Sequence, residues 1–213
     1  MSVEILSLSA RSEGEIAVTF EMRSGEHAQR ETFTVSAQLV ADLRLRKGAC
    51  DTDCYDAVSR GAEVGAAVKR GLYLLGYGSC SERTLVRKLV SKGVAREIAQ
   101  EAVSELERRG YLNEDADALR EAEKCIAKRW GQRRIAAALK EKGFAQESIQ
   151  HALYTLEDQG VDYAELCAER VRMKEGEVPD APDDRRRLVA SLQRYGFSTS
   201  EIREAFRMLK KED

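Results

Sequence analysis

The sequence has few residues of the kinds that interrupt helices or build disulfide frameworks. Its 213 residues include only 2 prolines, 2 histidines and 5 cysteines, and aromatic side chains make up 6%. So few prolines favour long uninterrupted helices, because proline breaks helix interiors. Five scattered cysteines, an odd number, argue against a secreted disulfide framework.

Signals for membrane insertion and secretion are also missing. The sequence has no run of 18 apolar residues, which argues against a transmembrane helix and against a membrane partner. The N-terminal residues lack a basic leader followed by an apolar core, so no secretory signal peptide is visible. We therefore expect the protein to be cytoplasmic.

Motifs of catalysis and metal binding are absent as well. There is no Gly-rich phosphate loop, no Gly-x-Ser-x-Gly elbow and no histidine pair at metal-ligand spacing. Cys50 and Cys54 could hold zinc only if ligands came from elsewhere in the chain, and ordinary thiols are the better interpretation. We expect no enzyme activity, no cofactor and no metal site.

Charged residues, by contrast, are abundant at 34%, although the formal net charge is only −2. The sharpest local excess is in residues 124–142, where seven basic side chains and one acid, Glu141, surround Trp130. Such a cluster is typical of a contact with DNA phosphates or with an acidic protein surface. A solvated helix face, with Trp130 as a packing residue, is the alternative. The candidate contact residues are Lys124, Lys128, Arg129, Arg133, Arg134, Lys140 and Lys142.

The first 36 residues have the two-residue period of half-buried strands. Apolar side chains alternate with polar or small ones at Ile16, Val18, Phe20 and Met22, and again at Phe33 and Val35. A Ser-Gly turn separates these segments, and VEILSL near the N-terminus is a third strand candidate. The pattern predicts a small antiparallel β-meander. A helix capped by Ser36 and ending near Lys47-Gly48, and a short helix over 53–59, should follow it.

Three stretches of the remaining chain match one another position by position. They are anchored on Gly93, Gly143 and Gly196, which are 50 and 53 residues apart. A leucine stands four residues before each glycine, an alanine nine residues after it and a leucine thirteen after it. This spacing places apolar residues on one face of two helices that are joined by a glycine turn. A further helix precedes each pair, over about 66–76, 115–129 and 162–174.

The predicted fold class is therefore mainly α, with three tandem three-helix repeats in an elongated array after the β-meander and its short helices. The expected domains are 1–60 for the β-rich N-terminal extension, and 61–112, 113–160 and 161–213 for repeats 1, 2 and 3. Ser198 followed by Glu201 predicts a capping box at the last helix. The final helices of repeats 1 and 2 are acidic and would repel phosphate, so they are not expected to read the DNA major groove.

These motifs resemble those of the RecX family. SERTLVRKLVSKG at 81–93 resembles its Ser-Glu-x-x-Leu-x-x-x-Leu-x-x-x-Gly motif, and ELERRGYLNED at 105–115 resembles its Gly-Tyr-Leu-Asp/Asn-Asp turn. KRWGQRRIAAALKEKGF at 128–144 resembles its Gly-x-x-Arg-Ile-x-x-x-Leu-x-x-x-Gly motif. The resemblance covers about 66–213 well, and the N-terminal strands match Gram-positive members more weakly. Asp117-Ala118 stand where members usually carry Phe-Ala, and Cys80 where they carry Arg.

The resemblance implies a non-enzymatic regulatory protein that binds the filament of the RecA recombinase on single-stranded DNA. Such a protein would inhibit or modulate filament growth and the recombinase, ATPase and coprotease activities, in homologous recombination, DNA repair and the SOS response. A monomer is expected, with single- or double-stranded DNA as a further possible partner. A helical-repeat DNA-binding protein that acts without RecA is the alternative, and a generic helical scaffold is the third hypothesis.

Overall fold

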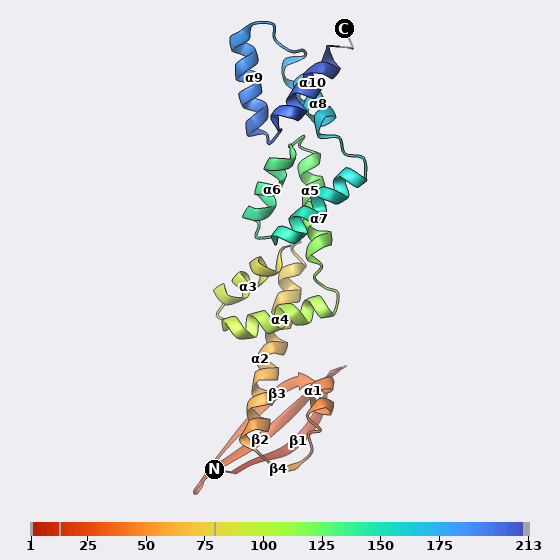
Figure 1. The fold of residues 1–213 in the computed structure, drawn as a ribbon. Coiled ribbons are helices and arrows are strands. Elements are labelled where there is room, and N and C mark those ends of the chain that lie inside the picture. The colour runs from red at the N-terminus through yellow and green to blue at the C-terminus, as the bar shows by residue number, and fades with distance from the viewer. Residues whose placement is uncertain (1, 13, 79, 211–213) are drawn as a thin grey trace. The chain divides into compact units, whose positions relative to one another are not determined.

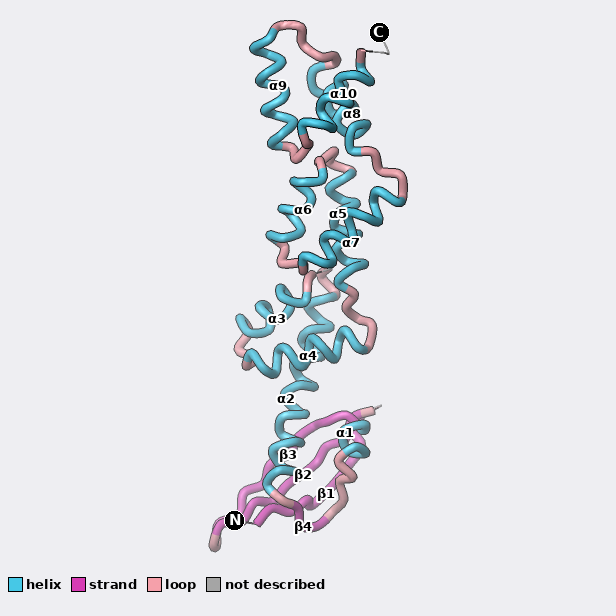
Figure 2. The backbone as a smooth tube through the Cα atoms, viewed as in Figure 1, coloured by secondary structure: helices cyan, strands magenta, loops and turns pink. Residues whose placement is uncertain are grey.

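The computed structural model describes residues 2–12, 14–78 and 80–210, and these residues form four strands and ten helices (Figure 1). The strands all lie between Ser2 and Cys50, and helices dominate from Thr52 onward (Figure 2). The chain divides into two compact units: residues 1–78 with 85–112, and residues 79–84 with 113–213. No helix within the described residues is long and apolar enough to cross a membrane.

The predicted antiparallel meander is confirmed and extended by one strand. Strands β1 (Ser2–Ser12), β2 (Glu15–Ser24) and β3 (His27–Ser36) pair in sequence, and β4 (Gly48–Cys50) pairs with β1. The strand order is β3-β2-β1-β4. The alternating residues Val18 and Phe20 are fully buried, as their two-residue period predicts. They form the sheet's core with Val58 of the following helix.

The helix after the meander begins where the sequence predicts but ends sooner. In α1 (Ala37–Asp42), Ser36 is the N-cap, and its hydroxyl accepts a hydrogen bond from the backbone nitrogen of Leu39 at 3.2 Å. The predicted end near Lys47-Gly48 is wrong. The backbone turns at Arg44, where φ is +51°, and the chain then enters β4. The chain therefore leaves the helix early, and its next residues pair with β1 as strand β4.

The prediction of two separate helices over 53–59 and 66–76 is wrong. Helix α2 (Thr52–Leu75) is one continuous helix of 24 residues. Asp51 caps it by accepting a hydrogen bond from the nitrogen of Cys54 at 2.7 Å. Interior glycines lower helix propensity, which is why the sequence pattern breaks there. Gly61 and Gly71 instead admit neighbouring side chains: a Cβ would lie 2.2 Å from Leu39 and 2.6 Å from Leu106, respectively. The expected domain boundary at residue 60 falls inside this helix.

The remaining helices follow the glycine pattern closely. They are α3 (Glu82–Ser91), α4 (Arg96–Arg108), α5 (Glu114–Ile126), α6 (Gln132–Glu141), α7 (Gln146–Asp158), α8 (Tyr163–Glu175), α9 (Pro182–Arg194) and α10 (Thr199–Leu209). Gly93, Gly143 and Gly196 follow α3, α6 and α9 with φ of +87°, +88° and +93°, so each turn uses the left-handed conformation that glycine favours. The capping box of Ser198 and Glu201 is present at α10.

The second unit holds two apolar cores. One lies among α5, α6 and α7 around Ile135 and Leu139, and the other lies among α8, α9 and α10 around Leu192 and Phe197. Asp117, where relatives were expected to carry Phe, is only 8% exposed. Its carboxylate accepts a hydrogen bond from Arg120 at 2.8 Å, so a charge-assisted contact stands at this edge of the first core.

Candidate interaction surface

The basic segment 124–142 runs from the last turn of α5 through a short loop into α6. Arg129 adopts a left-handed conformation, with φ of +52°, at the point where the loop reverses. The nitrogen of Trp130 then donates to the carbonyl of Cys125 at 3.2 Å and closes the turn. Trp130 is half-buried and packs against the core formed by α5, α6 and α7. This agrees with the alternative that Trp130 is a packing residue. The loop therefore has a defined conformation, and its cations have defined neighbours.

Three of the seven candidate cations bind carboxylates. Lys124 lies 2.5 Å from the carboxylate of Glu121, and Lys142 pairs with the same carboxylate. Arg129 pairs with Glu169 of α8 at 3.0 Å. Glu121 is only 8% exposed. Its burial acts to raise the pKa, but the hydrogen bonds from Lys124 and Lys142 outweigh that effect and lower the pKa of Glu121. These cations are therefore held by the protein itself.

Two further candidates are held by aromatic rings. The guanidinium of Arg134 lies 4.1 Å from the ring centre of Trp130 and 4.7 Å from that of Tyr195. Lys128 reaches the Trp130 ring at 5.3 Å, and Arg170 of α8 lies 3.2 Å from the ring centre of Tyr195. Cations over aromatic faces gain electrostatic attraction from the ring quadrupole. Arg134 thus joins the start of α6 to the turn after α9.

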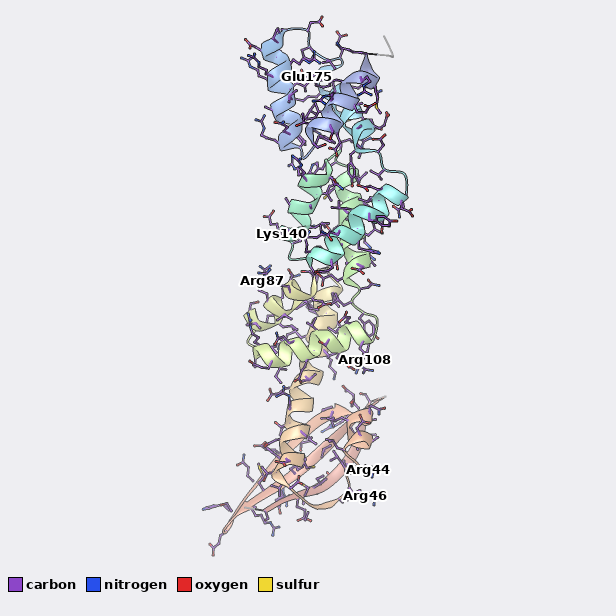
Figure 3. All side chains as sticks on the ribbon, viewed as in Figure 1. Arg44, Arg46, Arg87, Arg108, Lys140 and Glu175 are labelled. Carbon is purple, nitrogen blue, oxygen red and sulfur yellow. The ribbon has the colours of Figure 1, made fainter. Side chains whose placement is uncertain are left out.

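Arg133 and Lys140 are the two candidate contact residues whose positive charge is bound neither to a carboxylate nor to an aromatic ring within the described residues. Both side chains are exposed, and neither has a carboxylate partner within the described part of the chain. They stand seven residues apart, which is about two helical turns, so they lie on the same face of α6. Figure 3 shows Lys140 projecting away from the helix. This face of α6 is the part of the predicted cluster best suited to bind an anionic partner.

The start of α6 is also a structural joint, which the sequence did not indicate. Gly131 is the N-cap but carries no side chain to cap the helix. Its backbone nitrogen donates instead to the carbonyl of Tyr195 at 2.8 Å, and the nitrogen of Arg133 donates to the carbonyl of Gly196 at 3.2 Å. Backbone donors that a helix N-terminus leaves unsatisfied are therefore bonded to the α9–α10 turn.

Sequence reasoning missed a second group of basic residues, on α2, on α3 and the turn after it, and at the start of α4 in the first unit. Residues 66–78 and 85–96 contain six basic side chains and no acid. Within the described residues, only one of the six, Lys69, has a carboxylate partner, which is Glu15 at 2.6 Å. Figure 3 shows Arg87 projecting away from α3. The absence of acids, rather than the density of cations, is the sequence signal that could have identified this group. The six residues are Lys69, Arg70, Arg87, Lys88, Lys92 and Arg96.

Metal binding finds no support among the described residues. No group of three or more histidine, cysteine or acidic side chains is placed to hold a metal ion there. Cys50 and Cys54 are free thiols. Burial and the neighbouring Cys54 raise the pKa of the Cys50 thiol to about 11, which disfavours the thiolate that a metal would require.

The start of α9 contains three successive arginines at 185–187. Arg186 pairs with Asp183 and Arg187 with Asp184, each at 3.3 Å, so part of this positive charge is balanced within the helix.

Comparisons with known proteins assign the chain to a family. No family model matches it. It is 32% identical over 146 residues to the regulatory protein RecX of Pelodictyon phaeoclathratiforme, covering 67% of this chain and 88% of that protein. It is 33% identical over 145 residues to the regulatory protein RecX of Stenotrophomonas maltophilia strain R551-3, covering 66% of this chain and 85% of that protein.

Solved structures share the fold. A crystal structure of regulatory protein RecX superimposes with a TM-score of 0.70 at 22% identity, covering 98% of this chain and 99% of that one. A crystal structure of RecX from Lactobacillus salivarius gives 0.60 at 19% identity, covering 70% and 97%. The sequence relatives are named as regulatory proteins and not as enzymes. The chain belongs to the RecX family of regulatory proteins.

Proposed function

We propose that the protein is a non-enzymatic regulator of the RecA recombinase, which it binds on the RecA–single-stranded-DNA filament. Membership of the RecX family, carried by a match over 67% of the chain, is the observation that supports this most directly. In the proposal, binding opposes filament growth. It thereby lowers the strand exchange, ATP hydrolysis and coprotease activity that the filament supports in DNA repair and the SOS response.

The proposed mechanism uses the helices as three tandem repeats. Domains 61–112, 113–160 and 161–213 would each contribute one three-helix group, preceded by the β-rich extension of residues 1–60. Repeat arrays are quasi-one-dimensional, so they offer a long surface that can contact several neighbouring subunits of a filament. One bound molecule would then restrain more than one RecA subunit. Inhibition well below one regulator per recombinase is the expected consequence.

Within this mechanism, Arg133 and Lys140 are the residues we assign to the first salt-sensitive contact. Their charges have no carboxylate partner within the described residues, whereas Lys124, Arg129 and Lys142 already bind carboxylates. An exposed cation without an internal partner loses little when it binds an external anion, and the attraction falls as salt increases. An acidic face of the filament, or the DNA phosphates within it, fits this requirement.

The ATPase rate of RecA on single-stranded DNA tests the proposal when this protein is titrated in substoichiometrically. We expect a strong fall with the wild type and a much weaker one with the double variant R133E/K140E. The matched control R203E/R207E makes the same change of net charge on α10. Because it leaves α6 intact, it should inhibit nearly as well as the wild type.

Two results would count against the proposal. An unchanged ATPase rate with correctly folded wild-type protein, shown by circular dichroism, would remove RecA regulation as the function of this chain. Binding to DNA in a gel shift under those conditions would then favour the alternative of a DNA-binding protein that acts without RecA. Equal inhibition by R133E/K140E and wild type would retain the regulator but exclude this face of α6 as its contact.

A further inference from the structure

An acidic pocket lies in the second unit, between the turn that joins α7 to α8 and the start of α10. Its volume is about 620 Å³. Carboxylates of Glu157, Asp162, Glu201 and Glu204 line it, and no lysine or arginine among the described residues does. The wall of this pocket therefore carries negative charge that it does not balance itself.

The hydroxyl of Tyr163 belongs to this pocket and has no hydrogen-bond partner within the described residues. The Tyr163 side chain lines the pocket, yet the residue is only 6% exposed. Burial raises the pKa of Tyr163, and the charges of Glu157 and Glu201 on the pocket wall raise it further, so the hydroxyl keeps its proton. Buried polar groups in folded proteins are almost always paired. An unpaired one at a pocket indicates that a ligand supplies the missing partner.

Three of the carboxylates are fixed in place but keep one oxygen available. Oδ1 of Asp162 accepts the hydrogen bonds that cap α8. Oε2 of Glu201 accepts from the nitrogen of Ser198 at 2.6 Å and completes the capping box of α10. Oε1 of Glu157 accepts from Nε2 of Gln132 at 2.9 Å. In each case the second carboxylate oxygen has no partner within the part of the chain that the structure describes.

A guanidinium group matches this arrangement better than an anion or a metal ion does. Four carboxylates repel an anion. The described acidic side chains are not placed to hold a metal ion, which requires three or more ligands close together. A guanidinium is always charged and carries five N–H donors in one plane. It can donate to separated carboxylate oxygens and to the oxygen of a phenol, whereas the three donors of an ammonium group are crowded on one atom.

The pocket is open on the side of its carboxylates. Glu157 and Asp162 are exposed, whereas Tyr163 is buried. A site of this form can receive a side chain that projects from another protein, whose surrounding surface adds contacts that offset the entropy lost on binding. The wall already binds one guanidinium, because Glu204 pairs with Arg207 of its own helix at 2.9 Å. The charge and the opening both favour an arginine side chain as the occupant.

We propose that this acidic pocket binds an arginine side chain of a protein partner, with Glu157, Asp162 and Glu201 accepting its N–H groups together with the oxygen of Tyr163. The inference goes beyond the regulator proposal and does not depend on it, since a peptide is enough to occupy the pocket. It also concerns a surface of opposite charge to the face of α6 assigned above.

A nuclear magnetic resonance titration tests the site. The probe is an acetylated and amidated pentapeptide, Gly-Ala-Arg-Ala-Gly, and its matched control carries citrulline in place of arginine, which keeps the shape but removes the charge. We expect the backbone amide signals of residues 157–164 and 198–204 to shift with the arginine peptide and not with the citrulline peptide.

Carboxamide variants test the carboxylates. We expect E157Q/E201Q to weaken binding of the arginine peptide by about tenfold or more, because two charge-assisted hydrogen bonds are lost. Glutamine can still complete a capping box, so α10 should remain intact. The control E123Q/E147Q removes the same charge from exposed positions on α5 and α7 and should bind like the wild type. Circular dichroism melting checks that each variant is folded.

Tyr163→Phe tests the hydroxyl, since only one oxygen atom is removed. We expect binding of the arginine peptide to weaken by about fivefold, the effect of one hydrogen bond. The melting temperature should not fall, because the hydroxyl has no partner within the described residues to lose. A purely structural hydroxyl would give the reverse: a lower melting temperature and unchanged binding. Tyr154→Phe, at an exposed tyrosine of α7, is the matched control and should change neither quantity.

Several outcomes would overturn the inference. These are no shift with the arginine peptide, equal shifts with the citrulline peptide, full binding by E157Q/E201Q, or tighter binding of free agmatine than of the peptide, which would indicate a small-molecule cation instead. The two proposals fail separately. A wild type that suppresses RecA ATPase but does not bind the arginine peptide overturns only this inference. Specific binding of the arginine peptide together with an unaffected RecA ATPase rate supports this inference alone.

Discussion

Gly131 and Gly196 touch through their backbones, although 65 residues of sequence separate them. A Cβ on Gly131 would lie 2.5 Å from the carbonyl carbon of Gly196, and a Cβ on Gly196 would lie 2.4 Å from the nitrogen of Arg134. Two hydrogen bonds from the start of α6 to the α9–α10 turn depend on this approach. Because the neighbours are backbone atoms, no side-chain rearrangement can relieve the overlap.

Gly131→Ala should therefore destabilise the second unit. Gly131 has φ of −77°, so alanine is not strained there and only the contact is lost. We expect a loss of about 1–3 kcal/mol of unfolding free energy, typical of inserting a methyl group into a packed site. Chemical denaturation measures it. Gly65→Ala in α2 is the control. A Cβ at this position would have no neighbouring atom within 4 Å, so the change should be neutral or stabilising. Equal effects of the two changes would contradict the contact.

Arg134→Ala should weaken the same joint from its side-chain end. The guanidinium lies between Trp130 and Tyr195, and each contact of this kind contributes about 0.5–2 kcal/mol. Trp130 is the single tryptophan, so its fluorescence should change in the native state when the cation is removed. Arg133→Ala is the matched control, since that exposed side chain has no described partner and its loss should stay within about 0.5 kcal/mol. If the native fluorescence spectrum of Arg134→Ala were identical to that of the wild type, the contact of Arg134 with the Trp130 ring would be contradicted.

Glu121 should make stability depend on acid pH. Its pKa is lowered in the folded protein, because hydrogen bonds from Lys124 and Lys142 outweigh the opposing effect of burial. A lowered folded pKa gives stability that is fully present above the ordinary glutamate pKa of about 4.3 and is lost as pH falls through the folded pKa. Melting temperature measured from neutral to acid pH should therefore fall less steeply in Glu121→Gln than in the wild type. Glu204→Gln, at the exposed pair with Arg207, should keep the wild-type profile.

Ser81→Ala should destabilise the start of α3, whose first residues belong to the second unit. The Ser81 hydroxyl is fully buried, donates to the carbonyl of Lys142 at 3.0 Å and accepts from the nitrogen of Thr84 at 3.3 Å. Loss of a capping hydroxyl costs about 1 kcal/mol. Thermal melting should show the effect in Ser81→Ala and little change in Ser91→Ala, whose hydroxyl is exposed. A melting temperature unaffected by Ser81→Ala would show that the two bonds contribute nothing net.

Local features of the chain were predictable because they depend on neighbouring residues alone. The strand alternation of β2, the N-cap Ser36, the capping box at Ser198 and the glycine turns at Gly93, Gly143 and Gly196 all appear as the spacing predicts. Each is governed by backbone geometry or by a hydrogen bond within a few residues. The family resemblance rested on the same short-range spacing, and the comparisons confirm it.

Tertiary packing decided the rest. Helix α2 continues through Gly61 and Gly71 because Leu39 and Leu106 occupy the space that a Cβ would fill, which no local propensity reveals. Which cations remain available was likewise decided by distant partners, such as Glu169 for Arg129 and Tyr195 for Arg134. By itself, the sequence determined where the helices after α2 turn at their glycines, and where positive charge gathers. Only the folded structure decides which of those charges are already neutralised, because attraction and burial depend on distance in space rather than along the chain.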